Sequence, residues 1–415
     1  MAFDVDLALL DECVHCGFCL PTCPTYVITG DEAESPRGRI YLMDLATRGE
    51  APVDGPVTRH LDSCLGCLAC VPACPSGVKY NALIDSARPQ LDREVPRDRF
   101  FRSMVFALFP YPRRLRVAAL AGVLYERLGL RWLTRRSGLL RRMPARLRAL
   151  EGLLPPVRVR DLLGRTRETT HAAPRRDVAL LAGCAQRVFF KPVNDATARV
   201  LAAEGCRVAV PKGQGCCGAL SLHTGRDAEA REFARRTVDA FERYETVVVN
   251  VAGCGSVLKE YGELLRDDPK YAERAAAFAG RVRDVSEVLA ELEPVAERHP
   301  LPLRVAYHDA CHLANAQQIT REPRDVLRTI PGVELVGVAE EKICCGSAGV
   351  YNLLQPDTAE QLGRRKAENL AAARPDVIVT GNAGCLLQIR RYAENGPLIM
   401  HPVELLDHSI RGLAP

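Results

Sequence analysis

Two cysteine groups near the N-terminus constrain this chain of 415 residues more than any other feature. They are Cys13, Cys16, Cys19 and Cys23 in CVHCGFCLPTCP, and Cys64, Cys67, Cys70 and Cys74 in CLGCLACVPACP. Both match C-x2-C-x2-C-x3-C-P, the spacing with which bacterial ferredoxins hold two 4Fe–4S clusters. In such proteins three cysteines of a group wrap one cluster, and the fourth, followed by a proline that turns the chain away, ligates the other cluster.

This spacing predicts two ligand sets that exchange their fourth cysteine. The sets are Cys13, Cys16, Cys19 and Cys74 for cluster 1, and Cys64, Cys67, Cys70 and Cys23 for cluster 2. The alternative is a pair of zinc sites, because C-x2-C also binds zinc, but zinc rarely needs a third cysteine at this spacing or the terminal proline. Between the groups, SPRGRIYLMDLATRG indicates a helix that begins near Pro36, which favours a helical ferredoxin-like domain over the compact kind with strands.

The second half of the chain contains an internal repeat. Cys184, Cys216, Cys217 and Cys254 correspond to Cys311, Cys344, Cys345 and Cys385, and the first, second and last members of the two sets lie 127, 128 and 131 residues apart. Each copy alternates continuous apolar runs, typical of strands buried on both faces, with helical stretches. The strand candidates are residues 177–183, 206–210 and 246–253 in the first copy, and 303–310, 333–338 and 376–384 in the second. Both copies are therefore expected to be α/β with a parallel sheet, and the cysteines fall where strands end and helices begin.

The sequence leaves open what the repeat cysteines bind. Four thiols at matched positions favour metal binding in each copy, by a cluster or by zinc, over a redox-active disulfide or a site used only for packing. His223, His308 and His312 lie near the cysteines and are either ligands or, more often in such places, hydrogen-bond donors to the ligands or satisfied core groups. Cys206 has no counterpart in the second copy and is expected to be a small buried hydrophobe.

The region between the cysteine-rich parts is strongly basic. Residues 99–176 contain 19 arginines and four acids, giving +15, although the whole chain carries only +5. Arginine and leucine alternate there at helical spacing, so the region either links and docks domains, contacts an acidic partner subunit, or lies on an anionic membrane surface. Nucleic acid is not expected because no reader fold accompanies the charge. Purely apolar stretches fall short of a membrane span and no secretory signal is evident, so a cytoplasmic chain is expected.

The sequence resembles the iron–sulfur subunit family of glycolate oxidase (glycolate dehydrogenase) over nearly its whole length. The matching segments are CVHCGFCLPTCPTY, PRGRIYL, CPSGVKY, AGCAQ, GCCGA, GCGSVLKEYG, CCGSAGVYNL and GNAGC. The family is part of a wider group with two Cys-Cys-Gly (CCG) domains, which includes heterodisulfide reductase subunits and lactate-utilisation proteins. The resemblance implies an FAD-binding partner subunit that oxidises glycolate to glyoxylate. It also implies transfer of the electrons to a quinone or another acceptor, on the inner face of the cell membrane if the chain is peripheral.

One departure from the wider group concerns the cluster type. The heterodisulfide reductase relatives have a further cysteine where this chain has Val257 and Gln388, so their noncubane clusters cannot simply be transferred. We expect a multidomain α and α/β protein: a ferredoxin-like domain (1–95), a basic helical linker (96–176) and two CCG domains (177–296 and 297–415). No catalytic residue is expected in this chain. The alternatives are the same role for lactate or another 2-hydroxy acid, a heterodisulfide-reductase-like catalytic subunit, or a zinc-stabilised scaffold.

Overall fold

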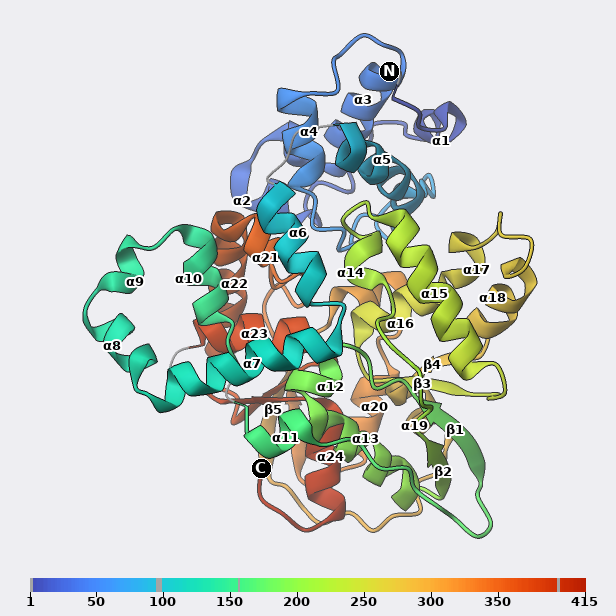
Figure 1. Ribbon diagram of the computed structural model, residues 1–415, viewed down its shortest axis with the longest axis vertical. Coiled ribbons are helices and arrows are strands. Elements are labelled where there is room, and N and C mark those ends of the chain that lie inside the picture. Colours follow the sequence, from blue (N-terminus) through green and yellow to red (C-terminus); the bar gives the residue numbers. More distant parts are fainter. Residues whose placement is uncertain (1–2, 95–98, 156, 394–395) are drawn as a thin grey trace.

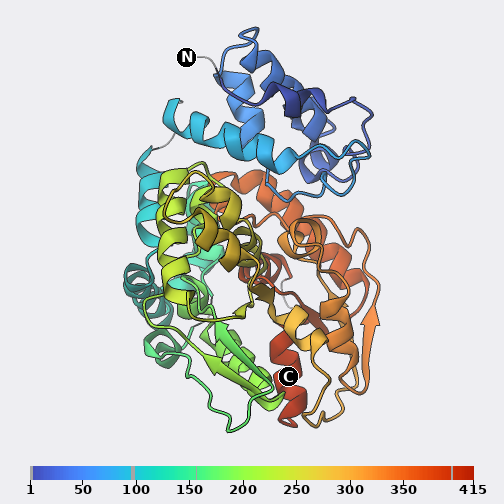
Figure 2. The same ribbon diagram turned by 90° about the vertical axis from the view of Figure 1, so that its right-hand side faces the viewer.

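The computed structural model describes residues 3–94, 99–155, 157–393 and 396–415. A helical N-terminal domain lies at the top of the molecule, two α/β domains lie below it, and the linker helices extend from the middle of the view to its left edge (Figure 1). Figure 2 shows the two α/β domains side by side beneath the N-terminal domain. The expected boundary at residues 95–96 lies outside the described residues.

The N-terminal domain is built from short helices around the two cysteine groups. They are α1 (Leu7–Asp11), α2 (Pro24–Thr29), the 3-10 turn η1 (Glu32–Glu34), α3 (Pro36–Thr47), α4 (Gly55–Asp62) and α5 (Tyr80–Glu94). Helix α3 begins where predicted, because Ser35 caps the amide of Gly38 and Pro36 occupies the first turn. Residues 3–94 contain no strand, so the expectation of a helical ferredoxin-like domain is confirmed.

The linker is folded against the α/β domains rather than extended between them. Its helices are α6 (Arg99–Leu108), α7 (Pro112–Arg127), α8 (Leu130–Arg136), α9 (Leu139–Arg142), α10 (Ala145–Gly152) and α11 (Val159–Leu163). Phe106 of α6 and Ala149 of α10 pack with Leu353, while Leu115 of α7 packs with Val188. Helices α8 and α9 project from the body as an arm (Figure 1). None of the helices in the described ranges is long and apolar enough to cross a membrane.

The first α/β domain has a four-stranded parallel sheet of order β2-β1-β3-β4. The strands are β1 (Arg176–Leu180), β2 (Cys206–Ala209), β3 (Val247–Val249) and β4 (Val282–Asp284). The helices are α12 (Gln186–Phe189), α13 (Lys191–Ala203), α14 (Ala219–Leu222), α15 (Asp227–Phe241), α16 (Ala252–Lys259), α17 (Tyr261–Leu264), α18 (Ala272–Ala279) and α19 (Val285–Glu291). Cys206 is fully buried in β2, which confirms its predicted role as a small hydrophobe.

The second α/β domain repeats this topology with the order β6-β5-β7-β8, again parallel throughout. The strands are β5 (Leu303–Tyr307), β6 (Val333–Val336), β7 (Val377–Val379) and β8 (Leu398–Met400). The helices are the π-helical turn η2 (His312–Ala316), α20 (Glu322–Arg328), α21 (Tyr351–Leu354), α22 (Pro356–Ala372), α23 (Ala383–Tyr392) and α24 (Pro402–Ile410). The predicted pair of parallel α/β domains is confirmed. Strands β4 and β8 were not among the sequence predictions.

The two α/β domains share one hydrophobic core and cross-link each other through polar contacts. Val178 and Val248 belong to the same buried cluster as Val305 and Val379. Arg199 forms a two-pronged ion pair with Asp407 at 2.9 and 2.6 Å. The Nε2 atom of His401 lies 3.0 Å from the carbonyl oxygen of Asn250. These contacts hold the two domains in a fixed relation.

Candidate metal centres

Both N-terminal cysteine loops bend through left-handed backbone conformations at matching positions. His15 (φ 52°) and Gly17 (φ 82°) flank Cys16, and Gly66 (φ 64°) and Leu68 (φ 58°) flank Cys67. Positive φ is uncommon for residues other than glycine, so His15 and Leu68 mark backbone that the surrounding structure holds in place. Such a loop curls the chain around a central point, as the wrapping of a compact cluster requires.

The structure brings the fourth cysteine of each group next to the other group. Cys74 lines a small cavity together with Cys13, Cys16 and Cys19, and Cys23 lines another together with Cys64, Cys67 and Cys70. This is the exchanged arrangement expected from the spacing. The assignment of these eight cysteines as ligands of clusters 1 and 2 stays a prediction.

A buried arginine that the sequence pattern did not single out lies beside the predicted ligands of cluster 2. Arg39 of α3 is almost fully buried, and its Nη1 atom lies 3.8 Å from the Sγ atom of Cys23. The same guanidinium donates to the carbonyl of His60 at 2.6 Å and to the carboxylate of Glu34 at 2.7 Å. The SPRGRIYL segment contains both Arg37 and Arg39, and the sequence pattern alone does not show which of the two side chains is buried.

Burial and neighbouring positive charge shift the pKa values of the thiols in the second group in opposite directions. Burial raises the pKa of the Cys64 thiol, but the positive charges of Arg39 and Arg88 outweigh it and leave that pKa below its usual value. The amide of Gly66 and the hydroxyl of Tyr80 also donate to the Cys64 Sγ atom, at 3.4 and 3.6 Å. Burial raises the pKa of Cys70 well above its usual value. Positive charge and donors aimed at buried sulfur fit an anionic iron–sulfur cluster.

The eight repeat cysteines line one cavity between the two α/β domains. Each set sits at the carboxyl ends of its parallel strands, where ligands bind in open α/β sheets. The cavity has a volume of about 310 Å³, and Leu150 and Leu153 of the linker also line it. The sequence predicted two separate sites, and the structure adds that they face a common space.

Within each repeat set, the sulfur atoms lie close together. The Sγ atoms of Cys217 and Cys254 are 3.0 Å apart, and those of Cys345 and Cys385 are 3.4 Å apart. Hydrogen bonding to neighbouring thiols and burial raise the pKa of Cys216 and Cys311 well above the usual value. Closely spaced buried thiols ionise readily only when a cation binds them, so this donor set fits a thiophilic metal or cluster.

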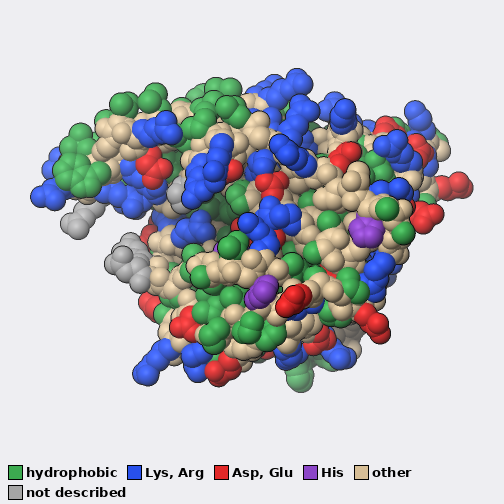
Figure 3. Space-filling model, turned by 90° about the horizontal axis from the view of Figure 1, so that it is seen from below, with side chains coloured by type: hydrophobic (Ala, Val, Ile, Leu, Met, Phe, Trp, Pro, Cys, Tyr) green, Lys and Arg blue, Asp and Glu red, His purple; other side chains and the backbone are tan. Residues whose placement is uncertain are grey.

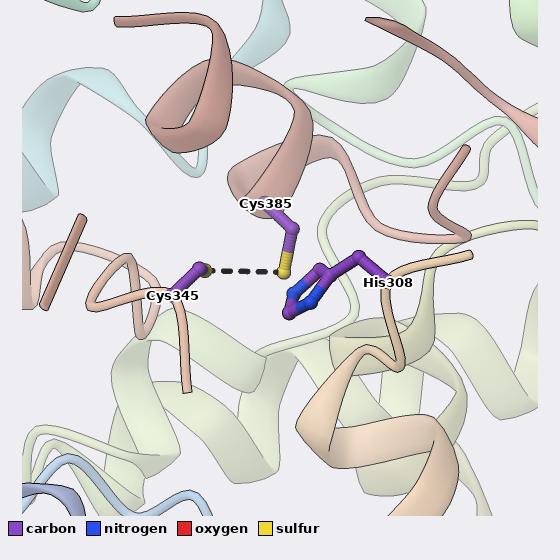
Figure 4. A group of neighbouring side chains, drawn as sticks. All are labelled: His308, Cys345 and Cys385. Carbon is purple, nitrogen blue, oxygen red and sulfur yellow. Dashed lines mark hydrogen bonds between the residues drawn. The ribbon is translucent and has the colours of Figure 1, made fainter. Parts of the chain in front are cut away.

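The three histidines near the cysteines differ in their surroundings. His308 is buried beside Cys345 and Cys385 (Figure 4), and burial, followed by the charge of Lys366, lowers its pKa to about 3. The rings of His223 and His312 face each other with centroids 4.7 Å apart, and the Nδ1 atom of His312 lies 2.8 Å from the Ser256 hydroxyl. Burial also lowers the pKa of His312 to about 4 and that of His223 well below its usual value, so all three imidazoles are neutral at physiological pH.

The second N-terminal cysteine group abuts the second repeat set. Cys67 and Cys344 belong to one buried cluster, against which Cys311 also packs. The side-chain amide of Asn315 donates to the Cys67 carbonyl at 3.0 Å, and the Tyr351 hydroxyl donates to the Ser63 carbonyl at 2.9 Å. The ferredoxin-like domain is thus anchored directly over the second set of repeat cysteines.

Comparison with known families agrees with this arrangement. A 4Fe-4S dicluster domain matches residues 12–78, the linker region of the glycolate oxidase iron-sulfur subunit matches 97–154, and the cysteine-rich domain (CCG) matches 178–259 and 305–390. The chain is therefore an iron–sulfur protein with two CCG domains, an electron-carrying subunit of an oxidoreductase.

Full-length relatives give a narrower assignment. The chain is 40% identical to the probable glycolate oxidase iron-sulfur subunit of Bacillus subtilis (strain 168), covering 93% of this chain and 89% of that protein. It is 35% identical to the glycolate oxidase iron-sulfur subunit of Escherichia coli (strain K12), covering 97% and 95%. The chain belongs to the family of glycolate oxidase iron–sulfur subunits.

Two further similarities are more distant. Lactate utilization protein A of Halalkalibacterium halodurans is 30% identical over 56% of this chain and 98% of that protein. A hypothetical protein from Helicobacter pylori of known crystal structure is similar in fold, with a TM-score of 0.55 and 7% identity, covering 91% of this chain and 68% of that chain. The second similarity concerns the fold alone.

Proposed function

We propose that this chain carries electrons from a flavin-bearing subunit, which oxidises glycolate to glyoxylate, to a quinone or another acceptor. The observation that supports the route most directly is the contact of Cys67 with Cys344 and Cys311 across the domain boundary. The route runs through two 4Fe–4S clusters on the eight N-terminal cysteines and continues to metal centres on the repeat cysteines. A bound 4Fe–4S cluster supplies reversible one-electron transfer.

The protein's own residues hold and insulate this route. The N-terminal loops fix the ligand cysteines in a preset backbone conformation, and Cys64, Cys67 and Cys70 of the second group are buried. Arg39 and Arg88 place positive charge beside Cys64 and offset part of the negative charge of a ligated cluster. No general acid or base in this chain is needed, because oxidation of the α-carbon belongs to the partner.

The substrate is proposed from the relatives. Glycolate oxidation releases two electrons and two protons, and a flavin accepts these as a hydride and a proton before passing single electrons onward. The similarity to lactate utilization protein A keeps lactate as the second candidate substrate.

The basic linker arm is proposed to bind the partner subunit. Leu128, Trp132 and Leu133 are each more than half exposed, and arginines lie among them. Figure 3 shows this arm at the left, where hydrophobic and basic side chains alternate. The strong positive charge of this region favours an acidic partner surface, and exposed apolar side chains of this kind typically mark an interface.

The route is tested by counting metals and following reduction in the full chain purified without oxygen. We expect about eight irons from the ferredoxin-like domain, with additional iron or zinc that is lost in Cys344→Ser and retained in the control Cys206→Ala. Stepwise reduction followed by EPR should show two interacting cubane signals. Little or no iron under these conditions would refute the proposal. Metal content unchanged by Cys344→Ser would remove the CCG domains from the route.

The arm is tested by copurification with the flavin-bearing subunit. Leu128→Glu together with Trp132→Ala should reduce capture of that subunit, whereas Val295→Glu, at an exposed apolar residue far along the chain, should not. Unchanged capture, combined with loss of binding to vesicles of anionic lipid, would show that the arm contacts a membrane instead.

A further inference from the structure

His308 occupies an unusual position at the end of β5. It is 2% exposed, and neither of its ring nitrogens has a hydrogen-bond partner among the described residues. A ring nitrogen of His308 and the Sγ atoms of Cys345 and Cys385 all lie within 4.8 Å of one another. Figure 4 shows the imidazole directed toward the two sulfur atoms. Buried polar groups are nearly always satisfied, so an imidazole without a partner requires an explanation.

The polar groups around His308 are already engaged elsewhere. The carboxylate of Asp309 accepts two hydrogen bonds from Arg324, at 2.8 and 2.6 Å. The ammonium of Lys366 donates to the carbonyls of Glu340 and Glu341, at 2.8 and 3.2 Å. The sulfur atoms of Cys345 and Cys385 are therefore the neighbours with which the imidazole nitrogen can share a polar interaction.

The first CCG domain lacks this nitrogen. His308 lies three residues before Cys311, and the residue three before Cys184 is Leu181, which is buried and apolar. In the second domain, Gln388 stands at the position where the heterodisulfide reductase relatives have a further cysteine. Its amide accepts a hydrogen bond from Asn352 at 3.1 Å and donates one to the carbonyl of Ala359 at 2.8 Å. Gln388 therefore does not replace the absent ligand, and His308 is the additional donor.

We propose that His308 is a nitrogen ligand of the metal bound by Cys345 and Cys385, so that the two CCG domains hold chemically different centres. The second centre takes cysteine thiolates together with one imidazole, whereas the first takes thiolates alone. The metal is iron within a cluster or zinc, both of which accept mixed nitrogen and sulfur ligands. This inference rests on the proposed function in one respect, namely that the repeat cysteines bind metal.

The test uses the full chain, labelled with ¹⁵N-histidine and purified without oxygen. Pulsed EPR detects directly bound imidazole nitrogen if the metal is paramagnetic iron, and X-ray absorption detects the imidazole shell if it is zinc. We expect a histidine nitrogen signal that disappears in His308→Leu and in His308→Cys. Because a thiolate replaces the lost ligand, His308→Cys should keep the metal content of the unaltered chain, whereas His308→Leu should lose metal. His312→Leu serves as the matched control, because His312 lines the same cavity and already bonds to Ser256.

The outcomes separate this inference from the proposed function. A second-domain metal whose nitrogen signal is absent, or survives both His308 variants, would overturn the assignment of His308 and leave the electron route intact. Retention of all metal in His308→Leu with only a shifted reduction potential would show a hydrogen bond to sulfur instead, and would also overturn it. Metal content insensitive to Cys344→Ser would refute both this inference and the role of the CCG domains.

Discussion

Replacement of Arg39 by methionine should lower both the stability of the ferredoxin-like domain and the reduction potential of its second cluster. The Arg39 side chain is 1% exposed and forms an ion pair with Glu34, which is itself only 12% exposed. It also donates to Thr25 and Ser63, at 3.0 and 2.8 Å. Methionine fills a similar volume but leaves the Glu34 charge and several acceptors without their partner.

The size of both effects follows from this geometry. Breaking a buried ion pair by removing one partner costs about 3–5 kcal/mol. The Arg39 charge lies 3.8 Å from the Cys23 sulfur, where a unit charge interacts by about 4 kcal/mol at an effective dielectric constant of about 20. Because an added electron spreads over the whole cluster, about half of that energy is relevant. The cluster potential should therefore fall by about 100 mV.

The assay is a redox titration followed by EPR, combined with thermal loss of the cluster absorbance. Arg37→Met is the matched control, because Arg37 lies two residues away, is partly exposed and pairs with the exposed Glu32. This control should change stability by less than about 1 kcal/mol and leave the second cluster's potential unchanged. Arg39→Lys should lose stability but keep most of the potential. A potential of the second cluster that is unchanged in Arg39→Met with full iron content would refute the electrostatic argument.

Three other predictions concern separate parts of the chain. Cys206→Ala should keep all metal and lose about 1 kcal/mol of stability, because Cys206 is buried in β2 away from the cavity; metal analysis and thermal unfolding check this. Tyr351→Phe should raise hydrogen exchange at Ser63–Cys67, because it removes a hydrogen bond worth about 1 kcal/mol from the domain contact. Burial, followed by the charge of Asp85, raises the pKa of Glu260 to about 7. The folded state therefore favours the protonated acid, and this stabilising contribution is lost as the pH rises through about 7. Glu260→Gln should accordingly stabilise the protein by about 1–2 kcal/mol at pH 8 and little at pH 4.5, as measured by thermal unfolding at both values.

The sequence predicted those features that depend on local spacing or periodicity. The C-x2-C-x2-C-x3-C-P groups identified the ferredoxin-like domain, and the repeated cysteines with continuous apolar runs identified two parallel α/β domains. The boundaries of the strands were less accurate: a strand is expected over 246–253, whereas β3 covers Val247–Val249 and Ala252 and Gly253 begin α16. Apolar runs at the end of a buried strand resemble the first turn of a buried helix, so periodicity does not separate them.

The features that the sequence did not predict depend on contacts between distant segments. Arg37 and Arg39 are nearly equivalent in sequence, and only the packing of α3 against the second cysteine loop shows that Arg39 is the buried one. His308 was one of three histidines near cysteines. Its ring nitrogens have no hydrogen-bond partner within the described part of the chain, which distinguishes it from His312 and is a property of the folded cavity alone.

The differences between the two CCG domains bear on the order in which electrons would reach the two proposed centres. Lys366 lies 21 residues after Cys345 and places a buried positive charge near the second set of thiols, whereas the residue 21 after Cys217 is the apolar Val238. This ammonium offsets negative charge at the second set of thiols, and less negative charge raises a reduction potential. The second centre is also the one that abuts Cys67. On the proposed route, electrons leaving the ferredoxin-like domain would therefore meet the more easily reduced of the two CCG centres first.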